Sequence, residues 1–508
     1  MNKKWFRRLF RQRLIIIILL LIQIAFILGV IISGSKILKA ANIVMTIIGA
    51  LLSLRIISKK DKSGYKLTWI FIILVFPLFG VSFYFVFNGK LRRNNFPKKY
   101  SNILNKLSDY NSSLINENIL GEVSQNFRGN AYYLQNETKF PLFKNNFVKY
   151  LSPGEKMFEE LINELKKAEK YIFLEYFIIQ EGKMWNSILE ILKEKVKQGV
   201  KVRVIYDDIG CFLKLPVNYK KILNDFGIEC EVFNKFRPIL TVKQNNRDHR
   251  KITVIDGKVA FTGGINLADE YINEKELYGY WKDSAVKIEG EAAWEFTLIF
   301  LQMWELITST DEDYLKYRPI DYQLNSHDGH IQPYADNPKD IENVGEHVYL
   351  NIINKAKDYL YIFTPYLIID SSLLSALKLA SKNGLNIKII TPGKYDKWIV
   401  HMTTKSYYSE LIESGVEVYE YQKGFMHSKI FLADDEIATI GTTNLDYRSL
   451  YLHFECGVCI YESKEISNIK NDFMNILKDS KKIALEDCKC GKLKTFFQEI
   501  LRLFAPLM

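Results

Sequence analysis

Two histidine–lysine pairs in this chain are followed by the same residue types at the same intervals. His249 precedes Lys251 by two positions, and His427 precedes Lys429 by two positions. Seven residues after each histidine stands an aspartate, and glycine and asparagine follow at matching distances: Asp256, Gly263 and Asn266 in the first copy, and Asp434, Gly441 and Asn444 in the second. Five residue types that recur at fixed spacing predict a duplicated functional site.

The spacing places the side chains where they could act on one phosphate group. Residues two apart on a β-strand project to the same face, so the imidazole and the ammonium of each pair would lie side by side. Asp256-Gly257 and Asp434-Asp435 are typical turn dipeptides, which predicts that each motif lies on a β-hairpin. The amides of Asn266 and Asn444 could donate hydrogen bonds to phosphate oxygens.

These residue types suit the cleavage of a phosphodiester in two displacements. A neutral histidine can attack phosphorus and form a phosphoramidate, while a second, protonated histidine donates a proton to the departing alkoxide. Lysines and asparagines would stabilise the charge that grows on the phosphoryl oxygens. We therefore expect no metal and no other cofactor. The candidate catalytic residues are His249, Lys251, Asp256, His427, Lys429 and Asp434, and for the two aspartates a purely structural role in the turn is equally open.

The elements around the motifs are also duplicated. In each half a helical stretch leads into an apolar strand, 171–179 or 359–369, and a second helix then ends near Gly199 or Gly384. Alternating strands and helices predict the α/β class, with helices on both faces of a largely parallel or mixed sheet. We expect two α/β/α sandwich lobes, at 151–320 and 346–485, related by a pseudo-twofold axis and joined by a linker at 321–345.

The first 90 residues contain three apolar segments, at 14–32, 40–57 and 67–87. The first is long enough to cross a bilayer and follows a cluster of six Lys/Arg residues. We expect two to three transmembrane segments, and thus a multi-pass protein of the cell membrane. The number of spans and the leaflet that the site faces stay open, because the basic residues after position 87 favour the inside whereas three full spans would place them outside.

Two stretches connect or follow these regions. Residues 91–150 are expected to be a linker and lead-in, and residues 486–508 a C-terminal amphipathic helix, since apolar residues recur there at helical spacing.

The net charge of +11 does not indicate a nucleic-acid-binding protein. Residues 1–100 hold 18 Lys/Arg and one acidic residue, so they carry +17, and the remaining chain carries −6. The positive charge therefore flanks the apolar segments, as is usual beside membranes. We expect a lipid bilayer as partner and no nucleic acid.

The two motifs resemble those of the phospholipase D superfamily, which carries paired His-x-Lys-x4-Asp sequences. Within it the chain is similar to the bacterial cardiolipin synthases, over nearly its whole length. The stretches that carry the likeness are Leu174-Glu-Tyr-Phe-Ile178, Thr364-Pro-Tyr366, Tyr280-Trp-Lys-Asp283 and Asn444-Leu-Asp446-Tyr-Arg448-Ser449, together with Phe454-Glu455. One departure is His453, where the family tends to have asparagine.

The resemblance implies two phospholipase D-like lobes and a phosphatidyltransferase. Two phosphatidylglycerol molecules would give cardiolipin and glycerol through a covalent phosphohistidine, with His249 as the favoured nucleophile. Glu455 and Asp283 become candidates to bind Nδ1 of the two histidines, although ordinary ion pairs would explain them equally well. The main alternative is a membrane-bound phospholipase D that hydrolyses lipid headgroups. Acyl-chain preference, oligomeric state and regulation are not predicted.

Overall fold

The structure is a computed structural model that describes residues 35–88, 96–236, 244–322, 327–338 and 342–507, with isolated positions between 21 and 32. The chain forms two compact units. The first, helical unit consists of Met1–Asn95, Phe236–Asn246 and Glu499–Met508, and the second unit consists of Phe96–Lys235 and Arg247–Gln498. The second unit contains both histidine motifs.

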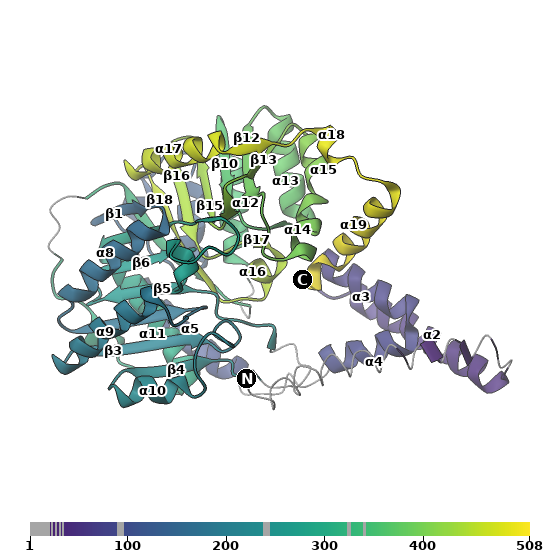
Figure 1. Cartoon of the computed structure of the whole chain (residues 1–508), viewed down its shortest axis with the longest axis horizontal. Helices are drawn as coiled ribbons and strands as arrows, with labels where there is room; N and C mark the ends of the chain where they lie inside the picture. Colours follow the sequence, from purple (N-terminus) through teal and green to yellow (C-terminus); the bar gives the residue numbers. More distant parts are fainter. Residues whose placement is uncertain are drawn as a thin grey trace. The chain divides into compact units, whose positions relative to one another are not determined.

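The first half of the larger unit is built on a seven-stranded sheet in the order β1-β8-β6-β5-β2-β3-β4 (Figure 1). β2, β3 and β4 are parallel, and the other neighbours are antiparallel. The strands are β1 (Asn146–Leu151), β2 (Tyr171–Tyr176), β3 (Lys201–Asp207), β4 (Glu229–Phe233), β5 (Lys251–Ile255), β6 (Val259–Gly263) and β8 (Ala285–Gly290).

The second half repeats this topology. Its eight-stranded sheet has the order β19-β13-β12-β10-β15-β16-β18-β9, so the seven strands from β13 to β9 match the first sheet in order and direction. The strands are β9 (His330–Asp336), β10 (Tyr359–Phe363), β12 (Asn386–Pro392), β13 (Glu417–Tyr421), β15 (Ile430–Ala433), β16 (Ile437–Gly441), β18 (Glu455–Tyr461) and β19 (Ser480–Lys482). β9 lies in the stretch expected to link the lobes and forms the edge of this sheet beside β18.

Helices pack on both sheets, which confirms the predicted α/β class with two similar lobes (Figure 1). In the first lobe α8 (Gly154–Lys167) packs beside α9 (Lys183–Lys197), and α11 (Glu291–Thr308) contacts β2, β4, β5, β6 and β8. In the second lobe α12 (Val344–Lys355) packs beside α13 (Ser371–Lys382), and α17 (Glu465–Lys478) contacts β13, β15 and β19.

The remaining elements of this unit are one 17-residue helix, α5 (Phe96–Ser112), and several short helices, turns and strands. The short helices are α6 (Glu117–Leu120), α7 (Arg128–Tyr132), α10 (Tyr219–Asp225), α14 (Trp398–Lys405), α15 (Tyr408–Ile412), α16 (Tyr447–Tyr451) and α18 (Leu485–Cys488), with turns η1 (Tyr133–Glu137), η3 (Asp269–Ile272) and η4 (Tyr314–Tyr317). Two small parallel sheets pair β11 (Leu367–Ile368) with β17 (Leu445–Asp446), and β7 (Tyr280–Lys282) of the first lobe with β14 (Gly424–Met426) of the second.

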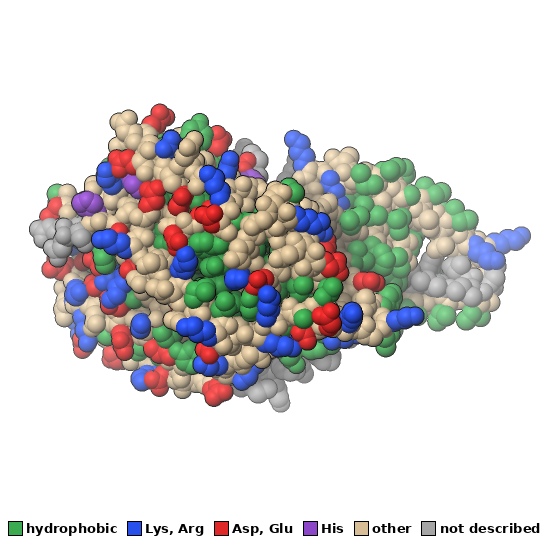
Figure 2. Space-filling model, turned by 90° about the horizontal axis from the view of Figure 1, so that it is seen from above, with side chains coloured by type: hydrophobic (Ala, Val, Ile, Leu, Met, Phe, Trp, Pro, Cys, Tyr) green, Lys and Arg blue, Asp and Glu red, His purple; other side chains and the backbone are tan. Residues whose placement is uncertain are grey.

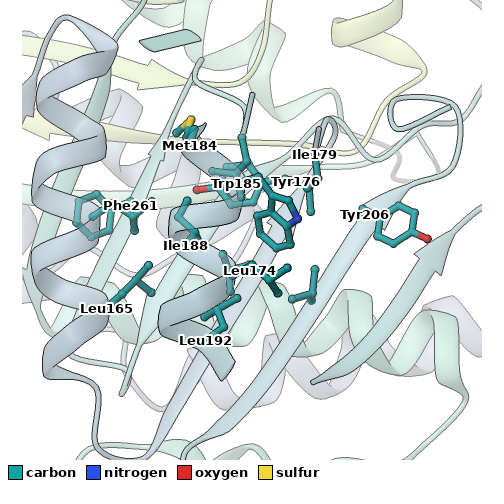
Figure 3. Packing of buried hydrophobic residues seen from close by; sticks show 14 of the residues in the cluster. Leu165, Leu174, Tyr176, Ile179, Met184, Trp185, Ile188, Leu192, Tyr206 and Phe261 are labelled. Carbon is teal, nitrogen blue, oxygen red and sulfur yellow. The ribbon is translucent and has the colours of Figure 1, made fainter. Parts of the chain in front are cut away.

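The core of the first lobe shows why the strand β2 is rich in apolar residues. β2 is buried along its whole length because helices cover both faces of the sheet. Trp185, Ile188 and Leu192 of α9 pack over Leu174 and its neighbours (Figure 3). This packing fixes β2, and β2 in turn fixes β5, which begins at a lysine of the first motif.

The helical unit contains α2 (Lys36–Ile57), α3 (Ser63–Val75) and α4 (Pro77–Asn88). They pack together around Trp69, Ile73 and Tyr84. Pro77 ends α3 because it cannot continue the hydrogen-bonding pattern, and Gly80 lets α4 approach α3: a Cβ there would lie 2.6 Å from the Ile72 carbonyl oxygen. On the face shown in Figure 2, hydrophobic side chains gather over the helical unit, whereas acidic and basic residues are mixed over the larger unit.

The three predicted apolar segments have different outcomes. Segment 14–32 lies almost wholly outside the described residues. Segment 40–57 lies in α2, which is the one helix long and apolar enough to cross a membrane in the part of the chain that the structure describes. Segment 67–87, expected to be a single stretch, is instead divided at Pro77 between α3 and α4.

The predicted C-terminal helix is α19 (Lys492–Phe504), followed by the turn η5 (Ala505–Leu507). Its last residues belong to the helical unit, where the Leu503 carbonyl accepts a hydrogen bond from Thr68 Oγ1 at 2.7 Å. The ring of Phe504 lies 6.0 Å from that of Phe71.

Candidate active site

Both motifs lie on tight β-hairpins, as predicted. β5 and β6 are joined at Asp256-Gly257, and β15 and β16 at Asp434-Asp435. Each turn spans three residues between the last paired positions, Ile255 with Val259 and Ala433 with Ile437. The first two residues of each turn have positive φ, between 52° and 66°, a conformation that is common in tight hairpin turns. The first strand of each hairpin, β5 or β15, pairs with a buried strand of its sheet, β2 or β10. The core of the lobe therefore positions the motif histidine, which precedes that first strand.

The two aspartates do not join the histidines. The carboxylate of Asp256 accepts backbone hydrogen bonds from Glu169, Lys170 and Tyr171 at 2.7–2.8 Å. Asp434 does the same for Lys357, Asp358 and Tyr359 at 2.7–2.9 Å. Each aspartate thus ties its turn to the start of the neighbouring strand, β2 or β10. Of the two roles that the sequence left open, these contacts favour the structural one, and we propose it for both aspartates.

His249 is held by a carboxylate from the other lobe. Its Nδ1 lies 2.9 and 3.0 Å from the two carboxylate oxygens of Glu455, which is fully buried at the start of β18. Thr442 Oγ1 donates a further hydrogen bond to Glu455. A carboxylate that accepts from Nδ1 keeps the proton on that nitrogen, so the lone pair of Nε2 is available to a substrate.

His427 has the reciprocal arrangement. Its Nδ1 lies 2.6 Å from Oδ2 of Asp283, which is fully buried directly after β7 of the first lobe. The ammonium nitrogen of Lys429 is also 2.9 Å from this Nδ1. The ring therefore has both a carboxylate and an ammonium within hydrogen-bonding distance of the same nitrogen.

Main-chain hydrogen bonds between the lobes fix both histidines in the same way. The backbone N–H of His249 donates to the carbonyl of Phe454, the residue before Glu455, at 2.9 Å. The backbone N–H of His427 donates to the carbonyl of Lys282, the residue before Asp283, at 2.7 Å. Each histidine is consequently anchored by backbone and side chain to the opposite lobe, and neither lobe alone holds a complete set of these groups.

The lysines belong to the same buried cluster. Lys251 Nζ donates to the carbonyl of His249 at 2.6 Å, and Lys429 Nζ donates to the carbonyl of His427. Asp283 and Glu455 act electrostatically on both lysines, and Lys251 acts on His427 of the other motif. The two motifs therefore form one electrostatic unit.

Burial controls the protonation of this cluster. Desolvation lowers the pKa of His249 to about 3 and the pKa of His427 to about 4, with the nearby lysines adding to the effect, so both imidazoles are neutral near pH 7. Desolvation also lowers the pKa of Lys251 to about 8 and that of Lys429 to about 7. Although burial raises the pKa of Glu455, the two histidines beside it hold that pKa well below its usual range.

Aromatic rings surround both histidines. The ring of Phe177 lies 5.0 Å from that of His249, and the rings of Trp281, Tyr271 and Phe425 lie 5.2, 5.6 and 5.7 Å from that of His427. This apolar lining removes water from the imidazoles, which explains the low pKa of each.

The two asparagines are placed differently. Asn266 is fully engaged: its Oδ1 accepts from the backbone N–H of Ile178 at 3.0 Å, and its Nδ2 donates to the Tyr271 hydroxyl at 2.8 Å. Asn444 makes a long contact of 3.5 Å to Asp446, and its buried Oδ1 has no hydrogen-bond partner among the described residues. In this arrangement Asn266 positions Tyr271 beside His427.

Comparison with known proteins agrees with the duplicated site. A family described as cardiolipin synthase, PLD-like domain, matches residues 161–304 and 349–477, which contain both motifs. A second family, described as phospholipase D-nuclease N-terminal, matches residues 45–88. A cardiolipin synthase of Alkalihalophilus pseudofirmus is 35% identical, over 87% of this chain and 88% of that protein.

The chain belongs to the cardiolipin synthase family of the phospholipase D superfamily. It is thus a phosphatidyltransferase, as expected from the resemblance.

Other members and one solved structure extend this assignment. A cardiolipin synthase of a Geobacillus species is 34% identical, over 94% of this chain and 95% of that protein. An uncharacterized protein of Streptococcus mutans is 44% identical, over 87% of this chain and 96% of that protein. The crystal structure of a phosphatidylserine synthase from Haemophilus influenzae superposes with a TM-score of 0.57 at 16% identity, covering 75% of this chain and 98% of that chain, which shows a shared fold.

Sequence reasoning missed the rings that face the histidines. His453 lies two residues before Glu455 and its ring is 5.6 Å from that of His249; Trp281 lies two residues before Asp283 and faces His427. Both residues stand two positions before a candidate carboxylate, and this shared spacing is the sequence signal that could have identified them. The ligand atoms of His249, His453 and Glu455 lie within 4.8 Å of one another, so this is the set that could hold a metal ion among the described residues.

Proposed function

We propose that this member of the cardiolipin synthase family joins two phosphatidylglycerol molecules into cardiolipin and glycerol through a phosphohistidine on His249. The reciprocal pairing of each motif histidine with a carboxylate of the opposite lobe is the observation that carries the proposal. It brings two imidazoles into one buried cluster, with their Nε2 atoms left for substrate and two lysines of lowered pKa beside them.

The first displacement forms a P–N bond between His249 Nε2 and the phosphorus of one lipid. The bond from phosphorus to the glycerol oxygen breaks. The phosphate anion bound beside His427 favours the protonated form of this ring, and the imidazolium donates a proton to the glycerol oxygen. The ammonium groups of Lys251 and Lys429 stabilise the charge that develops on the phosphoryl oxygens.

The second displacement reverses the roles. The terminal hydroxyl of a second phosphatidylglycerol attacks phosphorus, His427 takes the hydroxyl proton, and the P–N bond to His249 breaks. A new P–O bond completes cardiolipin, and both histidines return to their starting state. No nucleotide or oxidant is needed, because one phosphodiester is exchanged for another.

The environments of the two rings support this division of labour. His249 Nδ1 faces a carboxylate only, which keeps the Nε2 lone pair exposed as a nucleophile requires. His427 Nδ1 faces both Asp283 and the Lys429 ammonium, so its proton can reside on either ring nitrogen. A ring that exchanges protons suits the acid–base role.

The products of purified full-length protein test this function. Supplied with phosphatidylglycerol in vesicles, the protein should release glycerol and cardiolipin in equal amounts, measured by mass spectrometry. A His427→Ala variant serves as the control for contaminating activity. Phosphatidic acid as the main product would replace the synthase with the alternative phospholipase D, in which water takes the place of the second lipid.

We also propose a membrane topology of two crossings and one re-entrant hairpin. At 1.5 Å per residue, the 13 residues of α3 and the 12 residues of α4 are each too short for a hydrocarbon core of about 30 Å. If 14–32 and α2 cross and the α3–α4 hairpin returns, the Lys/Arg clusters at 3–13, 59–62 and 90–99 all lie on the cytoplasmic side with the lobes.

This topology supports the expected domain division, with a membrane region at 1–90 ahead of two lobes. Single cysteines placed at Ser35, Lys60 and Lys98 can be labelled with a membrane-impermeant maleimide in intact cells. Only the cysteine at position 35 should react. Labelling of the cysteine at position 98 would show three crossings and place the lobes outside.

A further inference from the structure

Two loops at equivalent places in the lobes expose large apolar side chains. The first follows β3 and spans residues 208–217; the second follows β12 and spans residues 393–399, of which the last two are the first residues of the helix α14. β3 and β12 have the same position in the two matching sheets, so both loops leave the carboxyl edge of their sheet. The exposed residues are Ile209, Leu213 and Val217 in the first loop, and Tyr395, Trp398 and Ile399 in the second.

Their exposure is large for these residue types. Leu213 and Val217 are 73% and 70% exposed, and Trp398 and Ile399 are 52% and 48% exposed. Single exposed apolar residues are ordinary on protein surfaces, whereas three on each of two related loops need a partner.

The first loop is connected directly to the histidine of its lobe. It packs so closely on the main chain of Phe177 that a Cβ at Gly210 would lie 1.9 Å from the Phe177 carbonyl oxygen. The next residue, Cys211, accepts a hydrogen bond from the backbone N–H of Ile179 at 3.1 Å. Phe177 in turn places its ring 5.0 Å from that of His249.

The second loop reaches the other histidine through a similar chain of contacts. The hydroxyl of Tyr366 donates to Asp396 of the loop at 2.7 Å. The ring of Tyr366 lies 6.5 Å from that of Phe425, which lies 5.7 Å from that of His427. Both apolar loops therefore sit one or two aromatic rings from the reacting imidazoles.

The charges of the two segments also match. Residues 208–221 hold Lys214, Lys220 and Lys221 against Asp208, and residues 393–405 hold Lys394, Lys397 and Lys405 against Asp396. Four of these lysines form ion pairs within the protein: Lys214 with Glu270, Lys220 with Glu231, Lys397 with Asp396 and Lys405 with Glu420. The attraction to an anionic surface therefore depends mainly on the exposed Lys221 and Lys394, one beside each group of apolar side chains. Exposed apolar side chains with an ammonium group beside them are the combination that binds an anionic phospholipid surface, because the apolar groups enter the headgroup layer and the ammonium groups pair with phosphates.

We propose that these two loops, which we call the rim, bind the catalytic unit to an anionic bilayer. Leu213 and Trp398 would insert beside the lipid whose phosphate reaches the two histidines. This proposal rests on the proposed function for the identity of the lipid. It explains how a buried centre, with both histidines less than 10% exposed, receives a substrate that stays in its membrane.

The test compares a membrane substrate with a monomeric one. Full-length protein is placed in phosphatidylcholine nanodiscs and given either long-chain phosphatidylglycerol within the disc or dihexanoyl phosphatidylglycerol dissolved below its micelle threshold. The variants are Leu213→Glu, Trp398→Glu and the double change. The matched control is Leu379→Glu, since Leu379 is 61% exposed near the end of α13, at the amino edge of β12 and thus away from the rim.

Each rim substitution should lower turnover of the long-chain lipid on the order of tenfold, the loss expected from withdrawing one large apolar group. Turnover of the dissolved lipid should change less than about twofold, and Leu379→Glu should change neither. Equal losses on both substrates would overturn the proposal in favour of a structural role, and unchanged turnover on both would overturn it outright. Turnover is measured as consumed phosphatidylglycerol, so the test holds whether the product is cardiolipin or phosphatidic acid.

Discussion

His249 and His427 have the same backbone anchors but different neighbours. His453 stands two residues before Glu455, and its ring lies 5.6 Å from that of His249. Trp281 stands two residues before Asp283, and its ring lies 5.2 Å from that of His427. Nδ1 of His249 contacts one carboxylate, whereas Nδ1 of His427 contacts a carboxylate and an ammonium. The duplicated backbone therefore supplies the geometry, and the side chains around it supply the difference in chemical role.

The comparison is tested most strongly by removing each histidine in turn. We expect His249→Ala to reduce turnover on the order of 10⁴-fold, as loss of a nucleophile does, and His427→Ala by 10²–10⁴-fold, the usual range for an acid–base group. A lipid with a p-nitrophenyl leaving group needs no proton from an acid. Release of p-nitrophenol should thus return in His427→Ala and stay absent in His249→Ala; the opposite pattern would exchange the two roles.

The carboxylates should matter next. Glutamine at position 455 can donate its amide hydrogen to Nδ1 and so place the proton on Nε2, which removes the attacking lone pair. We expect Glu455→Gln to lose on the order of 10³-fold in kcat, and Asp283→Asn on the order of 10²-fold because Lys429 still contacts Nδ1. Retention of the phosphohistidine burst in Asp283→Asn but not in Glu455→Gln would support the assignment. Equal effects would remove the distinction between the two pairs.

The lysines predict an alkaline limit to activity. Because burial lowers the pKa of Lys429 to about 7 and that of Lys251 to about 8, the free enzyme loses its ammonium groups as pH rises through this range. Both charges are present below pH 7, so the lysines favour the highest kcat/KM there. The fall should approach about tenfold per pH unit while one ammonium group is lost and up to about a hundredfold per unit above pH 8, where both are lost. The alkaline fall of kcat should lie at higher pH than that of kcat/KM, because a bound phosphate anion stabilises the ammonium form of each lysine. A kcat/KM that stays constant to pH 10 would contradict the lowered pKa values.

The smallest effect on chemistry is expected at the turn aspartates. Asp434→Ala removes the acceptor of three backbone N–H groups and should lower the free energy of unfolding by about 1–3 kcal/mol. Turnover per folded molecule should be unchanged, because the carboxylate lies away from the histidines. Asp434→Asn keeps one acceptor oxygen and tolerates positive φ, so its melting temperature should fall less. A fall in kcat without a fall in melting temperature would show that Asp434 has a catalytic role.

Local patterns in the sequence predicted the elements that depend on neighbours along the chain. The hairpins at Asp256 and Asp434, the apolar strands and the two similar lobes follow from turn residues and periodicity. Pro77 also carried a local signal for the break between α3 and α4, because proline ends a helix at the preceding residue.

Contacts between the lobes could not be predicted in this way. Spacing identified Asp256 and Asn266, but only the packed structure shows that one binds the start of β2 and the other binds Ile178 and Tyr271. The strand β9 pairs with β18, more than 100 residues away, and its own sequence does not specify that partner. Glu455 and Asp283 became candidates through family resemblance, since nothing in their local sequence points toward a histidine of the other half.

The exchange of carboxylates between lobes has an evolutionary consequence. A single lobe of this kind would contain a nucleophilic histidine but not the carboxylate that orients it. It could act only as a dimer with an identical copy, and the two histidines would then have identical surroundings by symmetry. When both copies lie in one polypeptide, the two histidines no longer need identical surroundings. A mutation can then alter one imidazole's surroundings alone, and the divergence of His453 from Trp281 is what such freedom permits.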